Sequence, residues 1–396
     1  MRFAATCNQV AETPAALDEA VSKIRSELGP GPVDLAFVFI SEGHGTYDPL
    51  ASELKDQLEA RHLLGCSAEA VIGQGAEIES GPALSLWCAR LPDVPIHSFH
   101  VEFERTPDGL VASGLPLNGE LPFQPSAVLL LGDPFSCAAE AIIEMLGDEY
   151  PGLPLLGGMA SGGRGPGTNM LFRDGETINH GGVGVFLGPG VEVQAIVSQG
   201  CRPVGQRFLV TKAQKNIVFE LGGRSALDQL GNVFSSLEER DQKLLQRGPH
   251  LGIAMNEYQE EFRRGDFLIA NVLGGDRSNG AIAIGHNVRV GQTVQFHVRD
   301  GETADEDLRT LMARTLDGQA TPEAALLFSC NGRGTRMFSM PNHDVGVVSE
   351  YTGSVPIAGL FAQGELGPVA GKNHMHGFTA SVALFRPCTP ASGAEA

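Results

Sequence analysis

The stretch AALLFSCNG at residues 324–332 decides the fold class, because VDLAFVFIS at 33–41 and SAVLLLGDP at 126–134 repeat its pattern. Each stretch is an apolar run with the length of a strand, and each ends in a polar or glycine-containing turn. Such runs are typical of strands that are buried on both faces of a sheet. The 51 glycines and 24 prolines indicate many tight turns. The repetition therefore predicts similar β-containing units rather than a helical bundle.

Two further sets of apolar segments follow these runs in the same order. The second set, which predicts strands that run into glycine-rich loops, is LLGCSAEAVIG (63–73), LLGGMASGGRG (155–165) and IAGLFAQGELGP (357–368). The third set, which predicts strands that close each unit, is PALSLWCARL (82–91), GVGVFLGPG (182–190) and GFTASVALF (377–385). Each unit then holds a parallel, right-handed β-α-β crossover followed by antiparallel strands. We expect an α/β fold of repeated βαβ-plus-hairpin units, with mixed β-sheets flanked by helices in an α-β-β-α layering.

The order of these units predicts two domains. We expect an N-terminal domain over 1–210 that contains two internal repeats, and a C-terminal domain over 211–386. Segment 250–298 is either a degraded fourth repeat or an unrelated stretch. The last residues, PCTPASGAEA at 387–396, are expected to form a disordered tail. Helices are predicted from apolar periodicity or charge density over 14–28, 49–61, 223–246 and 303–316.

Composition excludes several classes of partner. Lys and Arg number 28 against 47 Asp and Glu, which gives a formal net charge of −19. This charge repels nucleic acid and anionic membranes, and a single Trp with four Tyr leaves little for base stacking. No apolar stretch has the length of a membrane span or a signal peptide. The seven cysteines are scattered without a CxxC pair, as in reduced proteins. We therefore expect a cytoplasmic protein without nucleic-acid or membrane partners.

The loops after the predicted strands are the candidate ligand site, because ligands bind beyond the carboxyl ends of strands in α/β sheets. The segment CNGRG at 330–334 is the sharpest candidate. Arg333 offers a bidentate clamp for a carboxylate, Glu365 offers a partner for an ammonium group, and Asn331 offers a polar contact. The alternative is that Arg333 and Glu365 pair with each other structurally. The full candidate set for ligand binding is Cys66, Ser67, Cys330, Asn331, Arg333, Gly364, Glu365 and Asn373.

No cofactor is expected. The glycine clusters GGMASGGRGPG at 157–167 and GGDRSNG at 274–280 lack both the Lys of a P-loop and the spacing of a dinucleotide fingerprint. His374 and His376 alternate along a predicted strand, so both imidazoles are able to face one ion. No third ligand is identifiable for them, and we predict no metal site.

Cys330 permits an enzymatic alternative. A thiol at a strand end beside Arg333 has the surroundings of an activated nucleophile. Its general base would come from His343, His374 or His376. This hypothesis describes a cysteine-dependent amidohydrolase or acyl-transfer enzyme.

Five segments, taken in their order along the chain, resemble the FIST domain family, and the resemblance covers nearly the whole chain. They are LLGCS (63–67), FLIANVLGGDRSNGAIAIG (267–285), QFHVRDGETADEDL (295–308), FSCNGRG (328–334) and GELGP (364–368). The resemblance implies an N-terminal and a C-terminal FIST part and a sensory role in which a small ligand, such as an amino acid, is bound. Members of this family are often fused to histidine kinases or, in eukaryotes, to an F-box.

The length of this chain leaves no room for such an output domain, so we expect a stand-alone sensor that acts alone or through a separate signalling protein. The leading hypothesis is an intracellular small-ligand-binding protein whose ligand is an amino acid or another carboxylate metabolite. The alternatives are the Cys330-dependent enzyme and a protein-interaction scaffold.

Overall fold

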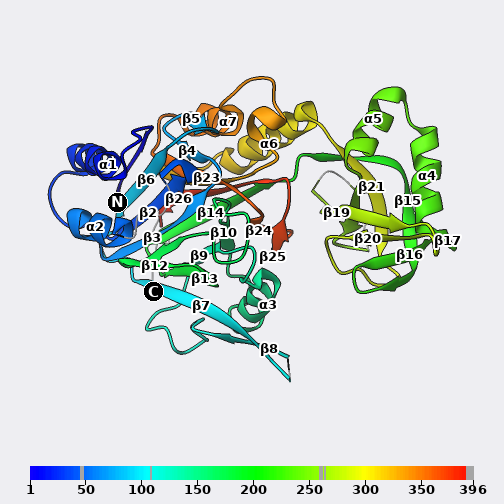
Figure 1. Cartoon of the computed structure of the whole chain (residues 1–396), viewed down its shortest axis with the longest axis horizontal. Coiled ribbons are helices and arrows are strands. Elements are labelled where there is room, and N and C mark those ends of the chain that lie inside the picture. Colours follow the sequence, from blue (N-terminus) through cyan, green and yellow to red (C-terminus); the bar gives the residue numbers. More distant parts are fainter. Residues whose placement is uncertain (45–48, 108, 258–261, 263–264, 389–396) are drawn as a thin grey trace, which may run out of the picture. The chain divides into compact units, whose positions relative to one another are not determined.

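The computed structural model describes residues 1–44, 49–107, 109–257, 262 and 265–388 (Figure 1). Part of the predicted tail, 389–396, lies outside these residues. The chain forms two compact units. Unit 1 comprises Met1–Val197 and Arg309–Ala396, and unit 2 comprises Ser198–Leu308. This division differs from the expected regions 1–210 and 211–386, because unit 2 is inserted into the stretch that contributes the third sheet of unit 1.

Unit 1 contains three mixed sheets with the same basic strand order. The first sheet is β1 (Arg2–Asn8), β6 (Leu84–Arg90), β2 (Leu35–Ser41), β3 (His62–Ala68), β11 (Leu171–Arg173) and β12 (Glu176–Ile178). The second is β8 (Gly109–Ser113), β7 (Ile96–Thr106), β13 (Gly182–Leu187), β9 (Ala127–Gly132), β10 (Leu155–Met159), β24 (Glu365–Val369) and β25 (Lys372–His376). The third is β14 (Val191–Ser198), β26 (Ala380–Pro387), β22 (Ala324–Cys330), β23 (Ile357–Ala362), β4 (Val71–Gly73) and β5 (Ala76–Ile78).

Every sheet of unit 1 is completed by a hairpin from another segment of the chain. We call residues 1–90 the first segment, 96–187 the second, and 191–198 with 324–387 the third. The hairpin β4–β5 of the first segment pairs with β23 of the third, β11–β12 of the second pairs with β3 of the first, and β24–β25 of the third pairs with β10 of the second. The exchange is therefore cyclic.

Within each sheet, the two strands of the predicted crossover are parallel. β2 pairs with β3, β9 with β10 and β22 with β23 in parallel, while β6, β13 and β26 run antiparallel to the first strand of their sheets. These pairings confirm the expected mixture of parallel crossovers and antiparallel closing strands.

A glycine occupies the same position in each second strand, and the backbone allows nothing larger. A Cβ on Gly65, Gly157 or Gly359 would lie 2.1, 1.8 and 1.8 Å, respectively, from a carbonyl oxygen of the neighbouring strand. The close approach of the two parallel strands thus requires a glycine at each of these three positions.

The three sheets share one hydrophobic core. Phe37 and Phe39 of β2, Leu129 of β9, and Leu326 and Phe328 of β22 all belong to it. The rings of Phe39 and Phe328 meet edge to face with centroids 6.4 Å apart. Three sheets therefore enclose this core, where the sequence suggested two stacked sheets.

The alternate residues of these strands face helices, which explains the uninterrupted apolar runs. Val38 and Ile40 pack with Leu17 of α1 (Thr13–Leu28) and Leu54 of α2 (Leu50–Leu58), which cover the outer face of the first sheet (Figure 1). Ile142 of α3 (Ala139–Glu149) packs against the second sheet in the same way. The remaining helices of unit 1 are α7 (His343–Thr352), η1 (Glu42–His44) and η2 (Gly334–Arg336), and α6 (Gly301–Leu316) runs across the boundary with unit 2. The α/β class with mixed sheets flanked by helices is confirmed.

Unit 2 has a different topology. Its strands follow the order β15 (Cys201–Gln214), β21 (Thr293–Arg299), β18 (His250–Ala254), β19 (Phe267–Asp276), β20 (Ala281–Ile284), β16 (Ile217–Leu221) and β17 (Arg224–Ser225). The registered pairs are antiparallel. Helices α4 (Ala226–Ser236) and α5 (Glu239–Arg247) replace the single predicted helix over 223–246. Segment 250–298 thus forms antiparallel strands without a β-α-β crossover, so it is not a fourth copy of the unit 1 pattern.

None of the helices among the described residues is both long and apolar enough to span a membrane.

The close strand approach makes a testable prediction. Gly359→Ala places a Cβ 1.8 Å from the Leu327 carbonyl oxygen, so we expect a loss of about 1–3 kcal/mol or more, as in overpacked cores. Gly147→Ala is the control, because its Cβ on α3 would meet no atom within 4 Å and is expected to stabilise by about 0.5–1 kcal/mol. Thermal melting of both variants measures the difference. A Gly359→Ala protein as stable as wild type would contradict the proposed constraint.

Candidate functional site

The first strands of the three sheets end at equivalent positions. The backbone N–H groups of Ser41, Asp133 and Cys330 each donate to a carbonyl oxygen just before the closing strand, at 2.9 Å in all three cases. Their side chains differ. Ser41 Oγ donates to Gly81 O at 2.9 Å, the two carboxylate oxygens of Asp133 accept from Asn169 and Ser136, and Cys330 Sγ accepts the Gly332 N–H at 3.5 Å. The three strand ends therefore carry different chemistry on the same backbone frame.

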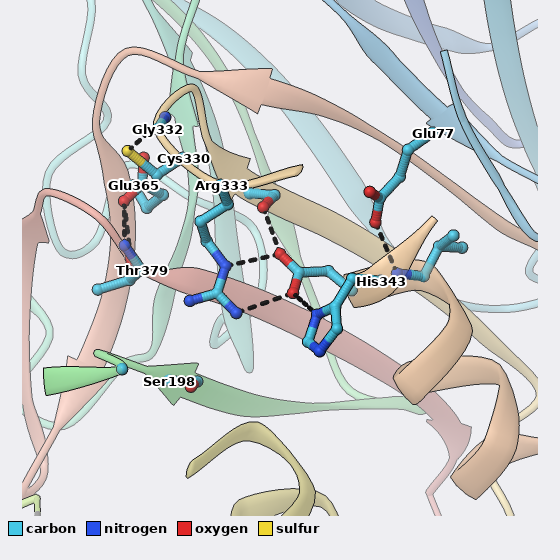
Figure 2. A network of polar contacts seen from close by, with 12 residues as sticks. Glu77, Ser198, Cys330, Gly332, Arg333, His343, Glu365 and Thr379 are labelled. Atoms are coloured by element: carbon cyan, nitrogen blue, oxygen red, sulfur yellow. Dashed lines mark hydrogen bonds and ion pairs between the residues drawn. The ribbon is translucent and has the colours of Figure 1, made fainter. Parts of the chain in front are cut away.

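The structure gives Arg333 a protein partner. Its side chain is fully buried and forms a bidentate ion pair with Asp344, with Nε to Oδ2 at 2.6 Å and Nη2 to Oδ1 at 2.8 Å (Figure 2). The Ser329 hydroxyl donates to the same carboxylate at 2.6 Å. The guanidinium that was expected to clamp a ligand carboxylate clamps a residue eleven positions later, because the buried Arg333 side chain reaches Asp344 in the first turn of α7.

His343 completes the surroundings of this ion pair. Its Nδ1 lies 2.9 Å from Asp344 Oδ1, and its ring stacks on Phe338 at a centroid distance of 3.4 Å. Burial alone would raise the pKa of Asp344, but Arg333 and the hydrogen bonds from His343 and Ser329 hold it well below its usual value. Asp344 is therefore a buried, charged anchor for the loop.

Glu77 reaches the same region from the first segment. Its Oε1 accepts the Val345 N–H at 3.0 Å at the start of α7, and its own N–H donates to Asn342 Oδ1 at 2.7 Å (Figure 2). Burial, followed by the negative charge of Asp344, raises the pKa of Glu77 to about 7. This carboxyl group thus titrates near neutral pH, while the carboxylate beside it stays charged.

The other expected ligand residues have structural partners. Glu365 is fully buried on β24, where its Oε2 accepts from the N–H and the hydroxyl of Thr379 at 2.9 and 2.7 Å (Figure 2). Asn373 on β25 donates to Leu153 O at 2.8 Å and accepts from Leu155 N at 2.9 Å. The alternative of an Arg333–Glu365 pair is not what forms, since Arg333 pairs with Asp344 instead.

Cys66 and Ser67 lie on β3, and Gly364 directly precedes β24. Cys66 is fully buried on β3, and burial raises the pKa of its thiol. Ser67 Oγ accepts the Met170 N–H at 2.9 Å, which fixes the exchanged hairpin β11–β12. Gly364 accepts the Met159 N–H through its carbonyl oxygen at 2.8 Å.

The three histidines considered as general bases for Cys330 each contact other residues. His343 is held by Asp344, as described above. His376 is buried on β25 with its Nε2 3.0 Å from Gly367 O, and its ring centroid lies 5.9 Å from that of His374. Cys330 is 8% exposed, and its Sγ accepts a hydrogen bond from the backbone N–H of Gly332.

Next to this buried network lies a group of polar residues, of which the sequence analysis named only Asn331. Arg336 Nη1 donates to Asn331 O at 2.9 Å, and Arg336 Nη2 pairs with Glu69, which follows β3. We call Glu69, Asn331 and Arg336 the strand-end cluster. The Glu69 N–H donates to Ser161 Oγ at 2.8 Å, so the ends of β3 and β10 are tied together next to the cluster.

Asn331 Oδ1 carries unused hydrogen-bonding capacity in this cluster. The atom is buried and has no hydrogen-bond partner within the part of the chain that the structure describes. The sequence analysis did not name Arg336 or Glu69, although each lies next to a motif that it quoted. Glu69 directly follows LLGCSA, and Arg336 follows CNGRG by two residues.

The structure also contains a shallow cavity of about 300 Å³, at the opposite ends of the strands. Ser126 and Pro154, which precede β9 and β10, line it together with Glu149 and Tyr150. This cavity lies at the amino ends of these strands, whereas the sequence predicted a pocket at their carboxyl ends.

These features define an α/β protein with polar strand-end loops, and comparisons identify its family. Residues 34–224 match the FIST N domain and residues 226–368 match the FIST C domain. The chain therefore belongs to the FIST family, as its sequence motifs suggested. FIST domains are in general sensory domains that bind small ligands.

Two mycobacterial proteins that are named as uncharacterized are similar to this chain over most of its length. An uncharacterized protein of Mycobacterium tuberculosis (strain H37Rv) is 40% identical over 388 residues, which cover 97% of this chain and all of that protein. An uncharacterized protein of Mycobacterium bovis is 40% identical over 372 residues, which cover 93% of this chain and 94% of that protein.

The buried ion pair predicts a large effect of Arg333→Ala. This change leaves the Asp344 carboxylate buried without its main counter-charge, so we expect a loss of about 3–5 kcal/mol. Arg309→Ala serves as the control, because Arg309 pairs with Glu350 at the surface and contributes about 1 kcal/mol or less. Chemical denaturation of both variants gives the comparison. Equal, small losses would refute the anchoring role of Arg333.

The raised pKa of Glu77 predicts a pH-dependent stability. The native carboxyl holds its proton up to about pH 7, whereas its ordinary pKa is 4.5, so the native state binds more protons between these values. Unfolding free energy contributed by this group therefore falls as pH rises from about 4.5 to about 7. Glu77→Gln removes this slope.

Melting curves of wild type and Glu77→Gln at about pH 5 and about pH 8 measure the effect. The stability of the variant relative to wild type should increase between the two pH values. A Glu350→Gln control, at an exposed carboxylate, should show no such increase. A constant difference for Glu77→Gln would show that Glu77 does not titrate in this range.

Proposed function

We propose that this chain is a sensor that binds a small zwitterionic metabolite, such as an amino acid, at the strand-end cluster. The observation that carries the proposal is the buried acceptor Asn331 Oδ1, which lies beside an exposed Arg–carboxylate pair. A buried acceptor without a donor costs about 1–3 kcal/mol, and a ligand donor removes that cost. The placement of the cluster after the carboxyl ends of β3 and β22 agrees with where α/β sheets bind ligands.

The charges of the cluster suit a ligand with one group of each sign. Arg336 is 57% exposed at its side chain, so its guanidinium is open to a ligand carboxylate, in the role first considered for Arg333. Glu69 is 33% exposed and supplies a carboxylate for an ammonium group. In the absence of ligand the two side chains pair with each other. Binding then exchanges one ion pair for two, and the ammonium or a hydroxyl of the ligand donates to Asn331 Oδ1.

We further propose that this sensor works in the cytoplasm as a stand-alone protein and passes its signal to a separate protein partner. The acidic net charge of −19 supports the absence of nucleic-acid and anionic membrane partners. Cys330 lies directly before Asn331. In this proposal its side chain packs beneath the polar surface and does not act as a nucleophile.

The test measures the binding of amino acids and organic acids to the protein, by thermal melting and by calorimetry. A ligand at about 100 times its dissociation constant stabilises by about 2.7 kcal/mol, which shifts the melting temperature by several degrees. Arg336→Gln should weaken binding by about 10- to 100-fold, the loss expected for a hydrogen bond to a charged group.

Arg61→Gln is the matched control. Arg61 also forms an exposed ion pair, with Asp34 at 2.9 Å, but it precedes β3 at the strand end opposite Glu69. Binding should be unchanged in this variant. If no amino acid or organic acid shifts the wild-type melting temperature, or if Arg336→Gln binds as wild type does, the proposal is wrong.

A further inference from the structure

Three potential metal ligands meet on the second sheet, next to the strand end at Asp133 and outside the strand-end cluster. His100 and Glu102 alternate along β7 and face the same side of the strand, and His180 lies two residues before β13. Glu102 Oε1 lies 2.9 Å from His180 Nε2 and 3.5 Å from His100 Nδ1. One ligand atom from each residue falls within 4.8 Å of the others.

The backbone holds His180 in this place. Gly181 has a φ of +70°, and a Cβ there would lie 2.2 Å from Val101 O, between the two ligands of β7. Its carbonyl oxygen accepts the Asp133 N–H at 2.9 Å, and its own N–H donates to Ser136 Oγ at 2.9 Å. Only glycine fits this close approach, which brings His180 beside His100.

Hydrogen bonds on the far sides of both rings leave the nitrogens nearest Glu102 to a proton or a metal ion. His100 Nε2 lies 3.1 Å from the His180 carbonyl oxygen, which only accepts, so Nε2 carries a proton. His180 Nδ1 lies 3.2 Å from Asn179 Oδ1 and donates to it, and His180 Nε2 lies 2.9 Å from Glu102 Oε1, which also only accepts, so without a metal ion this nitrogen donates to the carboxylate. A metal ion would replace that proton, while the outer partners orient both rings.

Two lone pairs that face a carboxylate repel each other, unless a proton or a metal ion lies between them. A tetrahedral zinc ion with bonds of about 2.1 Å separates its ligand atoms by about 3.4 Å, close to the 3.5 Å between Glu102 Oε1 and His100 Nδ1. The 2.9 Å between Glu102 Oε1 and His180 Nε2 would widen when an ion binds. Glu102 and His180 are about half exposed, so a further coordination position is open to solvent.

We propose that His100, Glu102 and His180 form a binding site for a divalent transition-metal ion such as Zn²⁺. Two imidazoles and one carboxylate suit Zn²⁺, Co²⁺ or Ni²⁺ and are too rich in nitrogen for Mg²⁺ or Ca²⁺. The sequence analysis did not find this site, because His100 and His180 lie 80 residues apart and the pairing of β7 with β13 brings them together. The site is independent of the strand-end cluster.

The test uses the full chain without a histidine tag, stripped with a chelator and titrated with Zn²⁺ by calorimetry. We expect one equivalent to bind, and Co²⁺ in its place to give the visible absorption of a four-coordinate ion. His100→Ala and His180→Ala should each weaken binding by more than about 100-fold, and Asn179→Ala by about 10- to 100-fold through its outer-shell contact.

His97→Ala is the control, since His97 is exposed on the same strand but belongs to no such cluster among the described residues. Its affinity should equal that of wild type. Far-UV circular dichroism checks that each variant is folded, which these surface positions allow. Failure of wild type to bind Zn²⁺, or equal affinity in His180→Ala and wild type, overturns the proposal. Loss of binding in His97→Ala would place the ion elsewhere and overturn it as well.

Discussion

The backbone hydrogen bonds between each second strand and a hairpin from another segment are the constraint on which unit 1 depends. Without the hairpin, β3, β10 or β23 would present an open row of backbone donors and acceptors. Each sheet needs a hairpin from one other segment to reach its full width, and because the exchange is cyclic, all three sheets are complete only when all three segments are in place. The shared core reinforces this dependence, since alternate residues of all three first strands meet inside it.

The exchange also determines the chemistry around CNGRG. The hairpin β4–β5 carries Glu77 to the start of α7, 268 residues away in the chain, and the turn before it carries Glu69 to Arg336. The first segment thus supplies three carboxylates that meet the third segment at this place, since Glu79 accepts from the N–H and the hydroxyl of Thr335 at 2.9 and 2.7 Å. Glu77 is buried and its pKa is raised to about 7, whereas Glu69 is partly exposed and paired. A buried anchor beneath an exposed polar surface keeps the loop rigid without closing that surface.

The sequence predicted the strands well, because a strand buried on both faces needs an uninterrupted apolar run such as LAFVFIS at 35–41. It did not predict which sheet each hairpin joins, since three-residue strands such as β4 and β11 carry no signal for their partner. Arg333 shows the same limit at the site. A glycine-flanked arginine is typical of an exposed loop, but the turn at Gly334 directs it inward to Asp344. For segment 250–298 the sequence allowed either a degraded fourth repeat or an unrelated stretch, and its antiparallel strands show that apolar runs alone do not distinguish the two topologies.

The location of the candidate site follows from how the three equivalent strand ends are satisfied. At Ser41, the hydroxyl both accepts from Ala83 N and donates to Gly81 O, so its polar capacity is used locally. At Asp133, Asn169 and Ser136 occupy both carboxylate oxygens. At the third end, Arg333, Ser329 and His343 all converge on Asp344, and the adjacent Asn331 is left with a buried acceptor that no described residue fills. One backbone frame used three times therefore yields two ends whose side chains are satisfied by neighbouring residues and one end with a buried acceptor that no described residue satisfies.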